Sequence, residues 1–204
     1  TVGSGSDLVI GGSGGDEITA GGGSNLVIGD SGRIPSAQAD TDRFGTLPLT
    51  VGLVETVGFG IGGVDRITAG SGGDIILGGH AGDIIEAGDG SNIVMGDDGK
   101  VDYVRAERDA TAAGADLDPA DIDLIESLST TSAGGIDEIT TGAGSDIVVG
   151  GRYGDTIKAG GGNNLVIGDS GWVTAASANA PQLAGIAMTL GLVETIASAD
   201  GGDD

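Results

Sequence analysis

The sequence predicts an all-β solenoid, in which short parallel strands stack along one axis and β-rich inserts interrupt the stack. Glycine makes up 44 of the 204 residues, where about 7% is usual. Asp or Asn recurs every nine residues in three blocks, each time after a glycine-rich pentad and before an aliphatic triplet. These positions are Asp7, Asp16, Asn25, Asp74, Asp83, Asn92, Asp146, Asp155 and Asn164. Repetition at a fixed short period indicates a solenoid and is not required by a disordered chain.

The repeats form one continuous solenoid with three inserts. Asn25 and Asn92 are 67 residues apart, and Asn92 and Asn164 are 72 apart, so the larger unit has about 70 residues, the scale of a solenoid module. No polar capping repeat is visible, and we therefore expect the chain to be an excerpt of a longer array. The expected boundaries are 1–32, 62–99 and 134–171 for the repeat blocks, 33–61, 100–133 and 172–200 for the inserts, and 201–204 for the start of a next block.

Each insert contains one related segment. The three segments are LTVGLVETV (49–57), DIDLIESLS (121–129) and MTLGLVETI (188–196), and they align on Glu55, Glu126 and Glu194. Alternating β-branched residues favour strands, although Asp118-Pro119 could instead begin an N-capped helix. A solvated strand face is the favoured role of the three Glu residues, with an inter-unit ladder or cation binding as alternatives. Trp172 aligns with Arg33 and Lys100, and we expect it at an exposed or interface position.

The aliphatic triplets belong to two series. The outward positions are polar in one series, as in Glu17/Thr19 and Arg66/Thr68, and apolar in the other, as in Ile75/Leu77 and Ile93/Met95. Central positions are apolar in both, so we expect them to point inward. An exposed apolar sheet of this size would be a contact surface. We therefore expect three layers, with the insert strands covering the apolar sheet, or else cover from a neighbouring chain.

The nonapeptide GGxGxDxUx, where U is a large aliphatic residue, resembles the repeat of the RTX (hemolysin-type calcium-binding) family. The resemblance covers residues 2–32, 62–99 and 134–171, and the inserts lie outside the family pattern. It implies a right-handed parallel β-roll in which two nonapeptides make one coil and Ca²⁺ sits between turns two repeats apart. Ca²⁺ suits turns rich in carbonyl and carboxylate oxygens, because it takes six to eight oxygen ligands in flexible geometry.

The same resemblance implies the ligands. Along one edge it pairs Asp7 with Asn25, Asp74 with Asn92, and Asp146 with Asn164. Along the other it pairs Asp65 with Asp83 and Asp137 with Asp155, directs Asp16 toward Asp30, and places Asp97 and Asp169 at matching closing turns. Asn25, Asn92 and Asn164 have a second interpretation, because Asn also stabilises turns through its own side chain.

Composition limits the function. A net charge of −23 disfavours nucleic acids and anionic membranes as partners, and no apolar run approaches the roughly 18 residues of a membrane span. With a single His, at position 80, we expect no enzymatic activity. We expect a secreted bacterial structural segment, exported by type I secretion, with calcium and other copies of itself, joined through the inserts or end to end, as partners. An adhesin or ligand-binding stalk and the accessory region of a secreted enzyme are the alternatives.

Overall fold

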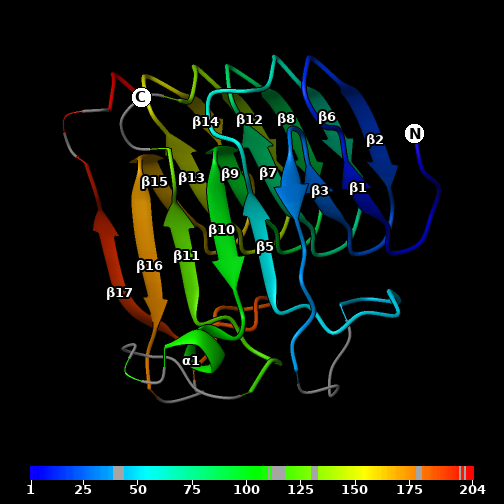
Figure 1. Cartoon of the computed structure of the whole chain (residues 1–204), viewed down its shortest axis with the longest axis vertical. Helices are drawn as coiled ribbons and strands as arrows, with labels where there is room; N and C mark the ends of the chain where they lie inside the picture. The colour runs from blue at the N-terminus through cyan, green and yellow to red at the C-terminus, as the bar shows by residue number, and fades with distance from the viewer. Residues whose placement is uncertain are drawn as a thin grey trace.

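The computed structural model describes residues 1–38, 44–109, 111, 118–129, 133–177, 181–197, 199 and 201–204. Its regular structure is nearly all strand, arranged as three sheets in layers (Figure 1). The described part contains one helix, the four-residue α1 (Arg105–Arg108). No helix within these ranges has the length and apolar character needed to cross a membrane.

Sheet A contains the apolar triplets. All of its neighbouring strands are parallel, and the triplets align residue for residue, for example Ile75 with Ile93 and Ile147 with Leu165. Its order is β1 (Leu8–Ile10), β3 (Leu26–Ile28), β7 (Ile75–Gly79), β9 (Ile93–Asp97), β13 (Ile147–Gly151) and β15 (Leu165–Asp169).

Sheet B contains the triplets with polar outward positions and is also parallel throughout. Within each block the chain passes alternately between sheets A and B. The central aliphatic residues of both sheets form one shared core, while the outward Glu17, Arg66 and Glu138 are exposed. The order is β14 (Thr156–Lys158), β12 (Glu138–Thr141), β8 (Ile84–Gly88), β6 (Arg66–Ala69) and β2 (Glu17–Gly21).

The inward position of the central residues is confirmed for the middle of the solenoid, but not at its last coil. Ile76, Ile85 and Ile139 are fully buried. Val166 on β15 is 44% exposed, because β15 is the last strand of sheet A and no further coil packs beside it.

Sheet C is antiparallel and is built from the inserts. It packs on sheet A through one apolar core that contains Ile75, Leu77, Ile93 and Met95, all buried. The three-layer expectation is therefore confirmed, with the inserts as the cover. The sheet order is β17 (Leu190–Thr195), β16 (Gly171–Ala175), β11 (Leu124–Ser127), β10 (Gly99–Asp102), β5 (Leu53–Thr56) and β4 (Gly32–Arg33).

Strands are thus confirmed for the recurring insert segments, and the alternative helix after Asp118-Pro119 is wrong. Residues 119 and 120 form a turn, and the chain then enters β11. Pairing within the sheet outweighs the local helix-start signal, because β11 is bonded to β10 on one side and to β16 on the other.

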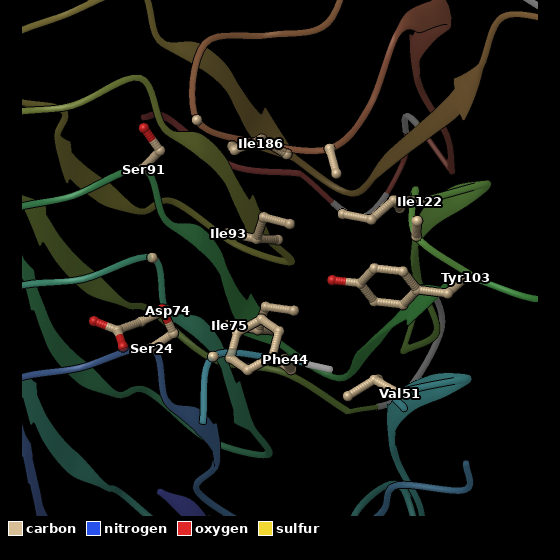
Figure 2. Close-up of a pocket in the computed structure, with 15 residues that line it drawn as sticks. Ser24, Phe44, Val51, Asp74, Ile75, Ser91, Ile93, Tyr103, Ile122 and Ile186 are labelled. Atoms are coloured by element: carbon tan, nitrogen blue, oxygen red, sulfur yellow. The ribbon is translucent and has the colours of Figure 1, made fainter. Parts of the chain in front are cut away.

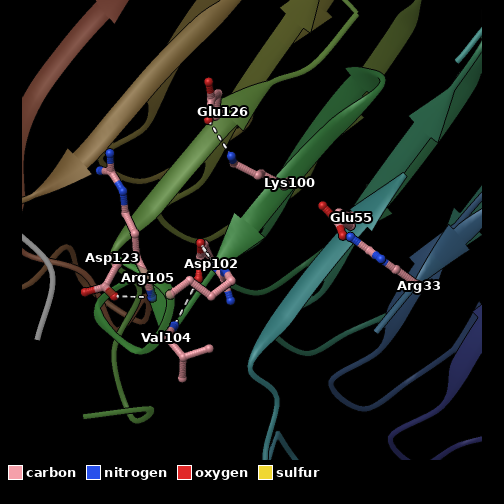
Figure 3. A network of polar contacts seen from close by, with 9 residues as sticks. Arg33, Glu55, Lys100, Asp102, Val104, Arg105, Asp123 and Glu126 are labelled. Atoms are coloured by element: carbon pink, nitrogen blue, oxygen red, sulfur yellow. Dashed lines mark hydrogen bonds and ion pairs between the residues drawn. The ribbon is translucent and has the colours of Figure 1, made fainter. Parts of the chain in front are cut away.

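The three recurrent Glu residues form the inter-unit ladder on sheet C. Register places them alternately with the aligned residues, in the order Arg33, Glu55, Lys100, Glu126, Trp172 and Glu194. Figure 3 shows the ion pair of Arg33 with Glu55 and that of Lys100 with Glu126, whose Nζ and Oε2 are 2.7 Å apart. Opposite charges on adjacent strands stabilise a sheet by roughly 0.2–1 kcal/mol per pair. In the third unit, Trp172 stands at the position that the basic residues Arg33 and Lys100 occupy in the first two. The Arg105 guanidinium lies 5.9 Å from the Trp172 ring centroid.

Sheets A and C separate around a cavity of about 290 Å³ (Figure 2). Its lining is mixed: Phe44, Ile93 and Ile186 are apolar, Asp74 and Ser91 are polar, and the Tyr103 hydroxyl points into it. Burial raises the pKa of Tyr103, so this hydroxyl stays protonated. The cavity lies at the seam between the two layers.

Candidate calcium sites

The phased Asp and Asn residues form two hydrogen-bonded ladders. At each rung, Oδ1 of one residue accepts the main-chain N–H of the rung before it. The first ladder is Asp7, Asn25, Asp74, Asn92, Asp146 and Asn164, with N···O distances of 2.7–3.0 Å. The second ladder is Asp16, Asp65, Asp83, Asp137, Asp155 and Asp204, with distances of 2.6–2.9 Å.

The five residue pairs predicted two repeats apart are all adjacent rungs. The predicted contact of Asp16 with Asp30 is wrong, because the N–H of Asp16 donates to Asp65 Oδ1 at 2.7 Å. The insert lies between these two rungs in the sequence. The next rung is therefore in the restart turn, residues 62–65, where the repeats begin again after the insert, and not in the closing turn that contains Asp30. Asp204 was missed as a rung, although the Gly-Gly-x-Asp pattern at 201–204 repeats the restart turns and could have identified it.

The second carboxylate oxygen has no hydrogen-bond partner at most Asp rungs. Among the described residues, Oδ2 is buried and unpartnered at Asp16, Asp65, Asp83, Asp137 and Asp155 of the second ladder, and at Asp7, Asp74 and Asp146 of the first. Buried polar atoms are almost always satisfied in native proteins, and burying an unpaired carboxylate is costly. This row of oxygen atoms therefore requires either protons or cations.

Main-chain oxygens converge on the same places. Beside the second ladder, a Cβ added at Gly78 would overlap the carbonyl oxygen of Gly96 and approach Asp83 Oδ2, and Gly150 repeats this arrangement with Gly168 and Asp155. Glycine thus leaves room for a carbonyl and a carboxylate oxygen to meet once per coil.

The donor set fits a hard cation. No group of three or more His, Cys, Asp or Glu side chains is arranged to hold a metal within the described ranges, so each site would combine its carboxylate oxygen with backbone carbonyls. All of these donors are oxygens, which is the chemistry that Ca²⁺ selects.

Comparison with known families agrees with this geometry. The model of the RTX calcium-binding nonapeptide repeat matches in four copies at residues 1–33, 59–94 and 140–171, about half of the chain. The chain carries RTX repeats. No curated protein and no solved structure gives a significant match.

The Asn rungs of the RTX repeats use their amides within the turn. Nδ2 of Asn92 donates to the carbonyl oxygens of Gly88 and Gly90, both at 3.2 Å. Asn25 does the same with Gly21 and Gly23 at 3.3 and 2.9 Å. The side-chain amide therefore donates hydrogen bonds to carbonyl oxygens of its own turn, which supports the turn-stabilising interpretation of Asn25 and Asn92. Asn164 makes the corresponding contact with the Gly160 oxygen at 3.0 Å.

Two closing-turn Asp residues, Asp97 and Asp30, bind the main chain beyond the insert that follows each of them, whereas Oδ1 of the third, Asp169, is buried without a hydrogen-bond partner among the described residues. Asp97 Oδ1 accepts the Gly135 N–H at 2.8 Å and its Oδ2 accepts the Arg152 N–H at 2.5 Å. Asp30 makes the equivalent bonds to Gly63 and His80, at 3.2 and 2.6 Å. These bonds fasten the restart turn to the coil, a role the sequence reasoning did not anticipate. Ligation of calcium by Asp30, Asp97 and Asp169 stays a prediction.

Burial raises the pKa of several ladder carboxyls, most strongly those of Asp83 and Asp137 on the second ladder. Desolvation and then the charges of Asp137 and Asp65 raise the pKa of Asp83 to about 9. Desolvation and the charge of Asp155 raise that of Asp137 to about 8. Asp74, whose neighbours in the first ladder are Asn, is raised by desolvation alone and only to about 6. Alternating Asp with Asn thus reduces the charge of the first ladder, and the second ladder is the stronger candidate for calcium.

These pKa values predict how the metal-free chain responds to pH. A carboxyl with a raised pKa binds more protons when folded than when unfolded, so its contribution is present below about pH 4 and lost as pH rises toward 9. Without calcium, the chain should therefore be more stable at pH 5 than at pH 8. Saturating calcium should oppose this loss, because the ion replaces the protons and binds more tightly at high pH.

Circular dichroism of the metal-free chain and urea unfolding of the calcium-loaded chain, each at the two pH values, measure both effects. A metal-free chain that is more stable at pH 8 than at pH 5 would contradict the prediction.

Proposed function

We propose that this chain is a calcium-folded structural segment of a secreted repetitive protein, and that it forms part of an extracellular fibre, matrix or surface layer. In this proposal the two parallel sheets form a right-handed β-roll whose turns are held by Ca²⁺. The observation that carries it is the row of buried Oδ2 atoms on the second ladder, which have no partner among the described residues. Calcium would supply the positive charge that balances these buried carboxylates.

The proposed mechanism couples folding to location. At low calcium the chain, with a net charge of −23, repels itself and stays unfolded, which suits export through a type I secretion system. Extracellular calcium modules bind at about 10⁻⁴–10⁻³ M, so the ion outside the cell would fold the chain after export. The free energy of calcium binding then contributes directly to folding. RTX repeats are typical of secreted bacterial proteins, which supports this localisation.

The proposal includes no catalytic role and no nucleic-acid partner. The recurring polar groups have architectural partners: the ladders join successive coils, and the Glu ladder joins the strands of sheet C. His80, the single His, contributes its main-chain N–H to Asp30. These arrangements favour a structural role over an enzymatic one.

Calcium titration followed by circular dichroism tests the proposal. We expect a cooperative gain of β-structure with a midpoint of about 0.1–1 mM. Mg²⁺ at the same concentrations should give no such transition, because it dehydrates reluctantly and requires a near-octahedral site. A chain that is equally folded in excess chelator at neutral pH would overturn the proposal.

A further inference from the structure

We propose that the cavity between sheets A and C binds a small neutral carbonyl compound with an apolar body, whose oxygen accepts a hydrogen bond from the Tyr103 hydroxyl. Close-packed protein interiors rarely contain voids larger than a water molecule, whereas this cavity has a volume of about 290 Å³. An apolar cavity of about 150 Å³ already holds benzene, so there is room here for a ring with a short substituent. The inference goes beyond the proposed structural role and needs only that the chain is folded.

The lining of the cavity has a polar side and an apolar side. Figure 2 shows Asp74 on one side, and Tyr103 and Ile122 on the other. The apolar part joins strand β9 of sheet A to the inserts, and its residues Ile93, Ile122 and Ile186 are at most 5% exposed. A bound molecule would therefore bury its apolar body between the two sheets. The carboxyl group of Asp74 and the net charge of −23 disfavour an anion, which is why we expect a neutral ligand.

Tyr103 provides the directional contact. It directly follows β10, and its hydroxyl points into the cavity. Burial raises the pKa of this hydroxyl, so it stays protonated and can donate a hydrogen bond. A carbonyl oxygen is the matching group, because it accepts a hydrogen bond without adding a donor that would itself need a partner.

Two residues at the cavity depart from the repeat pattern. The position of Tyr103, three residues after the basic or Trp position of the Glu ladder, holds Ser36 in the first unit and Ala175 in the third. Gly73 precedes its rung of the first ladder without a side chain. The corresponding residues before the other rungs all have one, and they are Ser6, Ser24, Ser91, Ser145 and Asn163. Because both departures line the same cavity, regular stacking alone does not account for it.

The cavity reaches the surface between two insert segments. Gly45 of the first insert and Gly185 of the third are exposed, and both line the cavity. Next to Gly45, the Thr46 N–H donates to Ser6 Oγ at 2.9 Å. Gly185 packs so closely on Ser91 that an added Cβ would lie 2.2 Å from its Oγ. Both sides of the entrance are thus held against turns of the first ladder, which gives a ligand a defined route inward.

Ligand-observed NMR titration of the calcium-loaded chain tests the inference with three molecules that share a benzene ring. Acetophenone has the carbonyl group, ethylbenzene has a similar shape without the oxygen, and benzoate is an anion. We expect one acetophenone to bind per chain in a saturable manner, with a Kd of about 1 mM or tighter, which is within reach of a ligand of this size. Benzoate should bind about tenfold more weakly or not at all, because like charges repel.

Tyr103→Phe removes the hydroxyl and keeps the ring. It should weaken acetophenone binding about threefold to tenfold, the usual contribution of one hydrogen bond, and leave ethylbenzene binding unchanged. The matched control is Tyr153→Phe, which removes a hydroxyl from a residue that is 45% exposed on a turn elsewhere. It should bind all three molecules like the wild type, and circular dichroism establishes that each variant folds.

Each contrary result has a definite meaning. A chain that folds with calcium but binds no acetophenone in a saturable manner would overturn this inference and leave the proposed function standing. Equal acetophenone affinity of Tyr103→Phe and the wild type would overturn the role of the hydroxyl and, with it, the choice of a carbonyl compound. Benzoate binding as tightly as acetophenone would overturn the expectation of a neutral ligand.

Discussion

Replacing Asp83 by Asn is expected to raise the calcium concentration needed for folding about tenfold, because affinity for calcium depends on the number of charged ligands. Asp83 is buried in the second ladder, where its Oδ1 accepts the Asp65 N–H at 2.7 Å and its Oδ2 has no partner. Asn retains the acceptor oxygen and replaces Oδ2 with an amide, so the hydrogen-bonded ladder is kept while the ligand charge is lost. Calcium titration by circular dichroism, together with calorimetry for the number of bound ions, measures the change.

Asn92→Ala is the matched control on the first ladder. It removes the oxygen that accepts the Asp74 N–H and the amide that donates to Gly88 and Gly90. Leaving a buried donor unsatisfied should cost about 1–3 kcal/mol of unfolding free energy in saturating calcium, without changing the number of bound ions. Loss of an ion from Asn92→Ala, combined with no loss from Asp83→Asn, would reverse the roles assigned to the two ladders.

Gly90→Ala is expected to lower the free energy of unfolding by more than about 4 kcal/mol, a size that arises only from specific mechanisms such as overpacking and backbone strain. Both mechanisms apply, because Gly90 has φ of +122° and an added Cβ would overlap the carbonyl oxygen of Gly72 in the neighbouring coil. Urea unfolding in saturating calcium measures this loss.

Two other glycines separate the two causes. Gly12 has φ of +104° but open space around it, so Gly12→Ala should cost only the backbone strain, about 1–3 kcal/mol. Gly161 has open space and no such φ, so Gly161→Ala should be neutral or stabilise by about 0.4–1 kcal/mol through the unfolded chain. Equal losses in all three variants would show that neither φ nor the distance between coils governs these turns.

The ladders were predictable from sequence because a nine-residue period determines which side chains reach the same edge of the stack. Asp74 and Asn92 are two repeats apart with no insert between them, and they are adjacent in the structure. The neighbour of Asp16 could not be found in this way, because 49 residues separate it from Asp65 and the intervening insert interrupts the period.

Other features depend on geometry that no period encodes. Whether Asn92 ligates an ion or holds its own turn depends on which carbonyl oxygens its amide can reach, here those of Gly88 and Gly90. The exposure of Val166 follows from its position at the last strand of sheet A. The four-residue α1 is too short to produce a periodic apolar pattern, so the sequence did not predict it.

The bonds of Asp30 and Asp97 across the inserts allow the repeat unit to be treated as an exchangeable cassette. Each carboxylate fixes the point at which an insert leaves the coil to the point at which the chain returns, through Gly63 in the first unit and Gly135 in the second. Extra residues between two such fixed ends add only a slowly growing entropy cost, which explains how spacings of 67 and 72 residues occur in one regular stack. A foreign segment with closely spaced ends could therefore be grafted between these points while the two ladders of Asp and Asn residues stay intact.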